Sequence, residues 1–432
     1  MKKIFLILLS LTLLNQKVFA ITLSEALLQA YTYNPELNAE RENINISKED
    51  LNISKSEFLP SITLSTSKSE ESTEKLTDRT GANSAITDVN PKTQSILVEQ
   101  KIFQGFAGIA GLEKNKIGLN LAQAKLLRVE QETLYKAIDA YSGLVLANEK
   151  LGINKKNVDL FEGTVETAQA RLERGQITIA DLAQSESSLA GAEAKFIQAE
   201  NEVITAKLVY EKIIGPITDV NNLIKKSDLI FKIPDNLNDS MELSKNNNPN
   251  LIIANLEFQQ SERDITIAAA DLSPSAKLSL KSSKTDDVSS SIDEQDKDTI
   301  TATISWPIFQ GGKNIASINR SKNKKNQKKL LFENAVKSND TSVASAWSNV
   351  QSTKSFLNSV KLQVQAAEIA NEGITEEYET GLGRSTLDVM QSNSILLNSK
   401  ISLVESERNY MLAQFKLLQS IGLLKNDHLK LQ

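Results

Sequence analysis

The sequence predicts a mainly α-helical fold of long antiparallel helical hairpins, with a few strands that contribute to a membrane β-barrel. Three observations lead to this prediction: a shortage of turn-forming residues, an internal duplication, and long heptad repeats. The 432 residues include only 17 glycines and 8 prolines, whereas these two types make up about 12% of an average chain. Turns are therefore scarce, and the elements between them must be long.

The N-terminus has the features of a secretory signal peptide. Lys2 and Lys3 precede the apolar run 4–14, which is shorter than the roughly 20 apolar residues that a membrane anchor needs. We therefore predict that residues 1–20 are removed on export. The leader contains Lys2, Lys3 and Lys17 and no acidic residue, so its removal changes the formal net charge from −5 to −8. A chain this acidic is not expected to bind nucleic acid.

Comparison of the sequence with itself indicates one unit used twice. The matching segments keep their order along the chain: Asn34-Pro35 with Asn248-Pro249, Pro60-Ser61 with Pro274-Ser275, Ile102–Gly105 with Ile308–Gly311, Ala140-Tyr141 with Ala346-Trp347, Asp181 with Asp388, and Ile214-Gly215 with Ile421-Gly422. We predict a first structural repeat at 21–216, a linker at 217–236, a second repeat at 237–424, and a C-terminal tail at 425–432.

Each repeat begins with a helix that starts at an Asn-Pro pair, because proline is favoured at the first helical position. Two alternating segments follow. In the second repeat Ile300, Ala302 and Ile304 fall on every second residue, the pattern of a strand with one apolar face. The predicted strands are 58–72 and 92–104 in the first repeat, and 272–287 and 296–309 in the second. The polar stretches at about 70–92 and 282–298 are expected to form exposed loops.

The remainder of each repeat has the period of a long helical hairpin, at 105–215 and at 311–422. In the first repeat Leu182, Leu189 and Phe196 recur at seven residues, accompanied by Ser185, Ala192 and Ala199. Such heptads pack antiparallel helices closely. The hairpin turns are expected near Gly175 and Gly381. An uninterrupted helix of about 70 residues would be about 100 Å long.

The composition excludes several classes of function. The chain has no cysteine and one histidine, His428, so disulfides, Cys/His metal sites and thiol nucleophiles are excluded. No phosphate-binding loop, metal-binding run or nucleophile elbow occurs. We therefore predict a protein that is not an enzyme and has no cofactor.

Four strands per chain are too few for a closed membrane barrel, for which eight is the usual minimum. Several identical chains must then contribute strands to one sheet. Together with secretion and long helices, this predicts an oligomeric conduit with its strands in an outer membrane. The alternative is a secreted or periplasmic coiled-coil protein, either structural and flagellin-like or a membrane-fusion adaptor, which leaves the duplicated strand pairs unexplained.

The sequence resembles the TolC family of outer-membrane efflux and secretion channels. The resemblance is carried by the motif Asn34-Pro-Glu-Leu37, by prolines 60 and 274 before the strand pairs, by Phe-x-Gly at 103–105 and 309–311, and by the two hairpin turns. It implies a homotrimer with a 12-stranded β-barrel in the outer membrane and an α-barrel that extends into the periplasm. It also implies a passive exit duct for drugs, other small molecules or type I secreted proteins.

The resemblance further implies partners and site residues. The partners would be a periplasmic membrane-fusion adaptor, an inner-membrane ABC or proton-driven transporter, and outer-membrane lipid. Asp181, Tyr378 and Arg384 match the family's periplasmic gate, while Asp388 and Gln391 match its ring of acids at the pore mouth, with glutamine in place of the second acid. The alternatives are that Tyr378 is a packing aromatic and that Arg384 and Asp388 form an ordinary i,i+4 helical pair.

A basic run near the start of the second long helix also has two interpretations. It comprises Lys322, Lys324, Lys325, Lys328 and Lys329. Such a run is most often a solvated helix face. Because it follows the predicted strands closely, contact with anionic lipid headgroups is the functional alternative.

Overall fold

The computed structural model describes residues 21–83, 88–225, 229, 231–289 and 291–431. The predicted signal peptide, residues 1–20, lies outside the described residues. The chain forms two compact units. We call them the helical unit, made of the described parts of Met1–Arg41, Lys125–Leu251 and Val336–Gln432, and the sheet unit, made of Glu42–Ala124 and Ile252–Ala335. Each unit draws on both sequence repeats.

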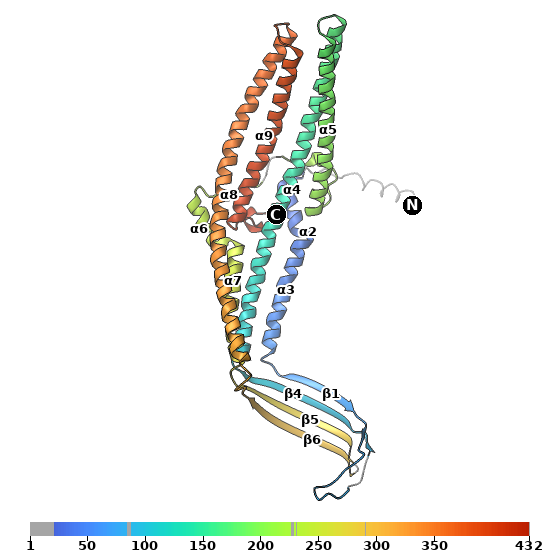
Figure 1. The fold of residues 1–432 in the computed structure, drawn as a ribbon, viewed down its shortest axis with the longest axis vertical. Helices are drawn as coiled ribbons and strands as arrows, with labels where there is room; N and C mark the ends of the chain where they lie inside the picture. The colour runs from blue at the N-terminus through green and yellow to red at the C-terminus, as the bar shows by residue number, and fades with distance from the viewer. Residues whose placement is uncertain (1–20, 84–87, 226–228, 230, 290, 432) are drawn as a thin grey trace, which may run out of the picture. The chain divides into compact units, whose positions relative to one another are not determined.

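The long helices come in two matched hairpins (Figure 1). In the first repeat α4 (Ala107–Glu173) is followed by α5 (Ile179–Ile213), and in the second α8 (Lys313–Glu379) is followed by α9 (Thr386–Ser420). Both α4 and α8 have 67 residues, and both α5 and α9 have 35. The predicted fold class, long antiparallel helical hairpins with few strands, is confirmed.

Small side chains at heptad spacing allow α5 and α9 to pack against each other. Ser185 and Ala192 of α5 are buried, as are Ser399 and Ser406 of α9. A short side chain leaves the backbones close, and the hydroxyls of Ser185, Ser399 and Ser406 are satisfied by carbonyls of their own helices. Ser185 and Ala192 lie beside Met390 of α9, so small residues of the first hairpin serve a contact between the two hairpins.

The shorter helices are α2 (Leu23–Tyr33), α3 (Pro35–Ser56), α6 (Leu237–Asn247), α7 (Pro249–Ala270) and α10 (Asn426–Leu429), with a 3₁₀ turn at Val220–Asn222. The Asn-Pro pairs join α2 to α3 and α6 to α7. In each pair the asparagine amide donates to the last carbonyl of a long helix: Asn34 to Ile213 at 3.2 Å, and Asn248 to Ser420 at 2.8 Å. The repeated motif thus satisfies a carbonyl that α5 or α9 leaves unpaired at its end.

The main hydrophobic core of the helical unit lies where α2, α4, α9 and the linker meet. Its fully buried side chains include Leu27, Leu134, Ile138 and Phe415. The ring of Phe231, from the linker, lies 4.7 Å from that of Phe415. The linker between the repeats is therefore part of the core.

The sheet unit contains a four-stranded antiparallel sheet in the order β1-β4-β5-β6 (Figure 1). Its strands are β1 (Ser61–Lys68), β4 (Lys92–Gln104), β5 (Ser275–Ser289) and β6 (Ile292–Ser305), and a separate pair joins β2 (Glu71–Ser72) to β3 (Asp88–Val89). Both edge strands, β1 and β6, have one neighbour only within the described chain.

The predicted loop at 282–298 is wrong. β5 and β6 continue through almost all of it, and their register runs from Ser275 opposite Ser305 to Asp286 opposite Glu294. The backbone ladder holds these residues extended whatever their side chains. These polar residues continue each strand past its alternating apolar residues. A prediction from composition alone assigns such a polar stretch to a loop. Among its described residues, the predicted loop at 70–92 holds the short β2–β3 pair and an isolated bridge between Thr77 and Asn83, and β4 begins at its last residue.

Within the described part of the chain, no helix combines the length and apolarity needed to cross a membrane.

Candidate functional site

The candidate site is the pair of hairpin turns in the helical unit. The first turn joins α4 to α5 and the second joins α8 to α9. Gly175 in the first turn has φ +69°, and Gly381 and Gly383 in the second have φ +77° and +85°. Only glycine adopts this left-handed region without strain, so these residues end the two long helices. The second turn is one residue longer than the first.

A capping box begins the helix after each turn. Asp181 accepts hydrogen bonds from the backbone N–H and the hydroxyl of Thr178, both at 2.8 Å. Asp388 accepts the same two bonds from Ser385, both at 2.9 Å. These bonds lower the pKa of each aspartate below its ordinary value, and the bond from the backbone N–H has the larger effect. The two acids, which the resemblance assigned to different roles, hold equivalent positions in the two repeats.

Tyr378 connects the two hairpins. Its ring lies beneath the guanidinium of Arg171 from the end of α4, with 4.0 Å from Cζ to the ring centroid. An Arg171 N–H also donates to the Tyr378 carbonyl at 3.5 Å. The tyrosine hydroxyl lies 3.1 Å from the hydroxyl of Thr386 at the start of α9. Tyr378 is 9% exposed, so it is both a packing aromatic of the seam and the contact between the turns.

Arg384 has a different partner from those expected. Its Nε donates to a carboxylate oxygen of Glu377 at 2.6 Å. This bond, rather than the i,i+4 relation to Asp388, is the main reason that the pKa of Arg384 is raised. Gln391 is exposed on α9. Among the described residues, the hydrogen bonds of the Asp181 side chain go to Thr178, and none joins it to Tyr378 or Arg384.

Sequence reasoning missed Arg171, Glu377 and Thr386. No repeat pattern marks them, since Arg171 and Tyr378 belong to different hairpins and meet only in the fold. The capping boxes could have been found, because Thr178-x-x-Asp181 and Ser385-x-x-Asp388 match the known N-terminal signature.

A groove of about 540 Å³ lies beside Tyr378, between α4 on one side and α8 and α9 on the other. Its lining contains no lysine or arginine. Four acidic residues line it: Asp159, Glu372, Glu376 and Glu379. The rest of its lining includes Leu160, Gly163 and Val389. The lining of the groove is therefore partly acidic and partly apolar.

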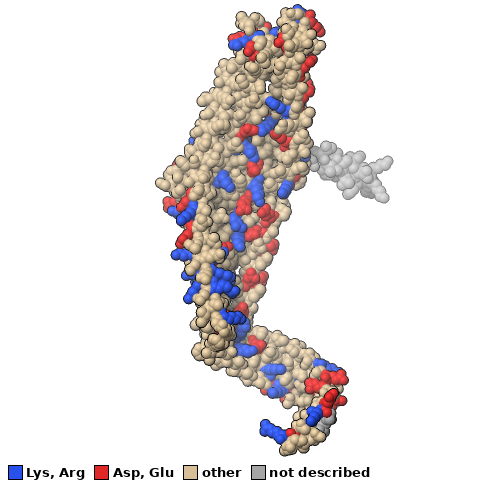
Figure 2. Space-filling model, viewed as in Figure 1, with Lys and Arg blue, Asp and Glu red and all other residues tan. Residues whose placement is uncertain are grey.

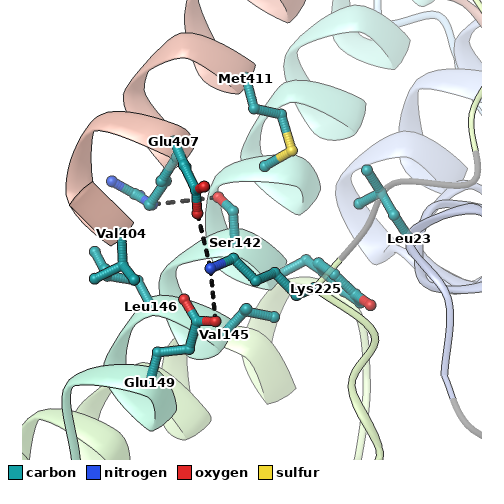
Figure 3. A pocket seen from close by; sticks show the side chains of 11 residues that line it. Leu23, Ser142, Val145, Leu146, Glu149, Lys225, Val404, Glu407 and Met411 are labelled. Carbon is teal, nitrogen blue, oxygen red and sulfur yellow. Dashed lines mark hydrogen bonds and ion pairs between the residues drawn. The ribbon is translucent and has the colours of Figure 1, made fainter. Parts of the chain in front are cut away.

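Further along the same helices, an ion-pair cluster ties the linker to both repeats (Figure 3). Lys225 of the linker bonds to Glu149 of α4 at 2.8 Å and to Glu407 of α9 at 2.7 Å. Burial lowers the pKa of Lys225, but the hydrogen bonds to the two glutamates outweigh burial, so its pKa is raised. Arg408 is paired with Asp139 nearby. These contacts fix α9 against α4.

The basic run on α8 is largely paired within the sheet unit, and Figure 2 shows its blue side chains gathered over the lower part of α8. Lys325 pairs with Glu262 at 2.9 Å, and Lys328 pairs with Glu257 at 2.6 Å. These pairs bind α8 to α7. The run therefore has a structural role, and only its outward lysines remain for lipid headgroups.

No group of three or more His, Asp or Glu side chains among the described residues could hold a metal ion.

Comparison with known proteins gives one consistent answer. Residues 26–215 and 241–423 match the outer membrane efflux protein family. The chain is 27% identical over 429 residues to the outer membrane efflux protein BepC of Brucella suis, covering 99% of this chain and 91% of that protein. It is 19% identical to the alkaline protease secretion protein AprF of Pseudomonas aeruginosa, over 80% of this chain and 72% of that protein.

The fold matches solved structures as well. The outer membrane protein VceC of Vibrio cholerae superposes with a TM-score of 0.79 at 17% identity, covering 93% of this chain and 96% of that one.

Proposed function

The chain belongs to the outer membrane efflux protein family and is an outer-membrane channel protein, and from this premise we propose that three copies close around one axis as a passive exit duct. The duct receives cargo from an inner-membrane pump through a periplasmic adaptor. The cargo class is drugs and other small molecules, or secreted proteins, since the relatives include one named for efflux and one for protease secretion.

The two unpaired sheet edges carry the proposal. β1 and β6 each expose a row of backbone N–H and C=O groups, which cannot stay unpaired in lipid. Neighbouring strands within the chain are antiparallel throughout, so β6 of one copy and β1 of the next are antiparallel as well. Three copies give the twelve strands that the resemblance implies, above the usual minimum of eight.

Exposed apolar side chains on the helices support the same assembly. α5 exposes Ile197, Ile204 and Leu208, and α8 exposes Leu362 and Ile369. Leucines and isoleucines at heptad spacing on an open face are typical of helices that pack against further helices. We assign these faces to contacts between copies, which close the helices into the α-barrel.

The gate is proposed to form between copies. Arg384 is held by Glu377 of its own chain, while Asp181 lies in the other turn. In the closed channel Arg384 would leave Glu377 for Asp181 of the neighbouring copy, and Tyr378 would fix the second turn through Arg171. Asp388 and the exposed Gln391 would face the mouth of the pore.

The groove beside Tyr378 is the proposed adaptor site. Its four acidic residues suit a helical hairpin with a basic tip, because complementary charge steers and orients partners. Its apolar lining residues would receive apolar side chains of the same hairpin.

Cysteine cross-linking tests the assembly, because the natural chain has no cysteine of its own. Cysteines in place of Ser65 on β1 and, in a scan, of Thr299, Thr301 or Thr303 on β6 should give one disulfide-linked trimer. The single-cysteine variants are the control. Extraction in detergent as a trimer that conducts ions in planar bilayers is the expected result; a monomer without conductance would contradict the duct.

A further inference from the structure

The register of the sheet separates its residues into two unlike faces. Leu280 of β5 lies opposite Val98 of β4 and Ile300 of β6. Side chains alternate between faces along a strand, so the even-numbered residues here form one apolar face. The odd-numbered residues of β5 and β6, and those of β4 from Thr93 to Lys101, form the opposite face, which we call the polar face.

The polar face carries four lysines. They are Lys101 on β4, Lys277 and Lys281 on β5, and Lys297 on β6. The face also holds three acids. Glu99 pairs with Lys277 at 2.8 Å, and Asp287 of β5 and Asp293 of β6 lie at the hairpin end of their strands.

Three of these lysines face no acid directly across the sheet. Lys101 lies opposite Lys277, Lys281 lies opposite Leu97 and Thr299, and Lys297 lies opposite Ser283. Like charges directly opposite each other destabilise an antiparallel pair. A lysine pair that the sheet itself disfavours needs another explanation.

Charges on the apolar face follow a different rule. They lie toward the β5–β6 hairpin end of the strands and include both signs. Three lysines, Lys68, Lys92 and Lys284, lie there with four acids, Asp286, Glu294, Asp296 and Asp298, and Lys284 is paired with Glu294. The surplus of lysine is therefore specific to the polar face.

In a membrane barrel the apolar face meets lipid and the polar face lines the lumen. This step rests on the proposed channel. We infer that Lys101, Lys277, Lys281 and Lys297 form a cationic band inside the barrel that favours anions. Rings of charged side chains set selectivity in pores, and a low-dielectric wall focuses their field. The band suits cargo that carries carboxylate or phosphate groups.

The experiment measures the zero-current potential of the channel in planar bilayers under a KCl gradient. In the triple variant Lys101→Gln, Lys281→Gln and Lys297→Gln we expect a shift toward greater cation permeability. We also expect weaker block by pyrophosphate added on the barrel side. Lys284→Gln is the matched control, because it removes a lysine of the same strand from the opposite face.

Two results would overturn the band: equal potentials and equal pyrophosphate block in the wild type and the triple variant, or an equal shift in Lys284→Gln. Should the triple variant fail to insert, Lys101→Gln alone removes the disfavoured lysine pair and should insert, with a smaller shift in the same direction; no shift would count against the band. A wild-type protein that never conducts would instead contradict the channel itself.

Discussion

The guanidinium of Arg171 lies 4.0 Å above the ring of Tyr378 and joins the end of α4 to the end of α8. A cation–π contact at a partly exposed site contributes about 0.5–1 kcal/mol. A contact this weak can hold the turns together at rest and still yield to a partner that binds beside it.

Replacing Tyr378 should therefore loosen the closed mouth. We expect Tyr378→Leu to raise single-channel conductance, because it removes both the cation–π contact and the bond to Thr386. Tyr378→Phe keeps the ring and should stay near the wild type. Equal conductance in Tyr378→Leu and the wild type would exclude a role in closure.

Glu377 and Arg384 should have opposite effects on conductance. Arg384→Ser removes the proposed contact with Asp181 of the next copy and should raise conductance. Glu377→Gln frees Arg384 from its present partner and should lower conductance by strengthening the closed state. Planar-bilayer recordings measure both conductances. A change in the same direction for both variants would contradict the proposal that Arg384 exchanges Glu377 for Asp181 of the next copy.

Gln391 should tune block by multivalent cations. Gln391→Glu adds a second acid per chain to the proposed ring, so a lower concentration of hexaamminecobalt(III) should block the channel. Asp388→Asn should weaken that block. Because Asp388 also caps α9, Ser385→Ala serves as its control: it removes the hydroxyl bond of the cap and keeps the acid.

Acidic pH should open the starts of α5 and α9. The pKa values of Asp181 and Asp388 are lowered from an ordinary value of 3.8, so their capping bonds contribute fully above about pH 4 and are lost as pH falls through the lower folded values. Hydrogen exchange of residues 179–183 and 386–390, corrected for its intrinsic pH dependence, should lose protection in that range. Protection unchanged down to pH 2 would contradict the linkage.

Gly422 should tolerate no side chain. Its φ is +80°, and an added Cβ would lie 2.2 Å from the carbonyl oxygen of Asn247. We expect Gly422→Ala to lower the thermal unfolding temperature of the detergent-solubilised protein. Gly152 of α4 has no atom within 4 Å of an added Cβ, so Gly152→Ala should stabilise by about 0.5–1 kcal/mol.

Much of the fold could be predicted from local sequence. The hairpins follow from heptads and scarce glycines, and glycines 175 and 381 lie in the turns where they were expected. The polar ends of β5 and β6 could not be predicted in the same way, because a polar stretch of strand has no periodic apolar signal. The contact of Tyr378 with Arg171 escaped prediction because a single contact between distant segments leaves no repeat in the sequence. Arg384 and Glu377 are only seven residues apart, and their pairing depends on the path of the turn between them.

The even number of strands in each sheet has a consequence for stoichiometry. With four strands per chain, β6 of any copy and β1 of the next always run in opposite directions, whether two, three or four copies are present. Strand pairing alone therefore does not determine the number of subunits. In the proposed assembly that choice falls to the helices, whose exposed apolar faces would fit together at only one angle between copies.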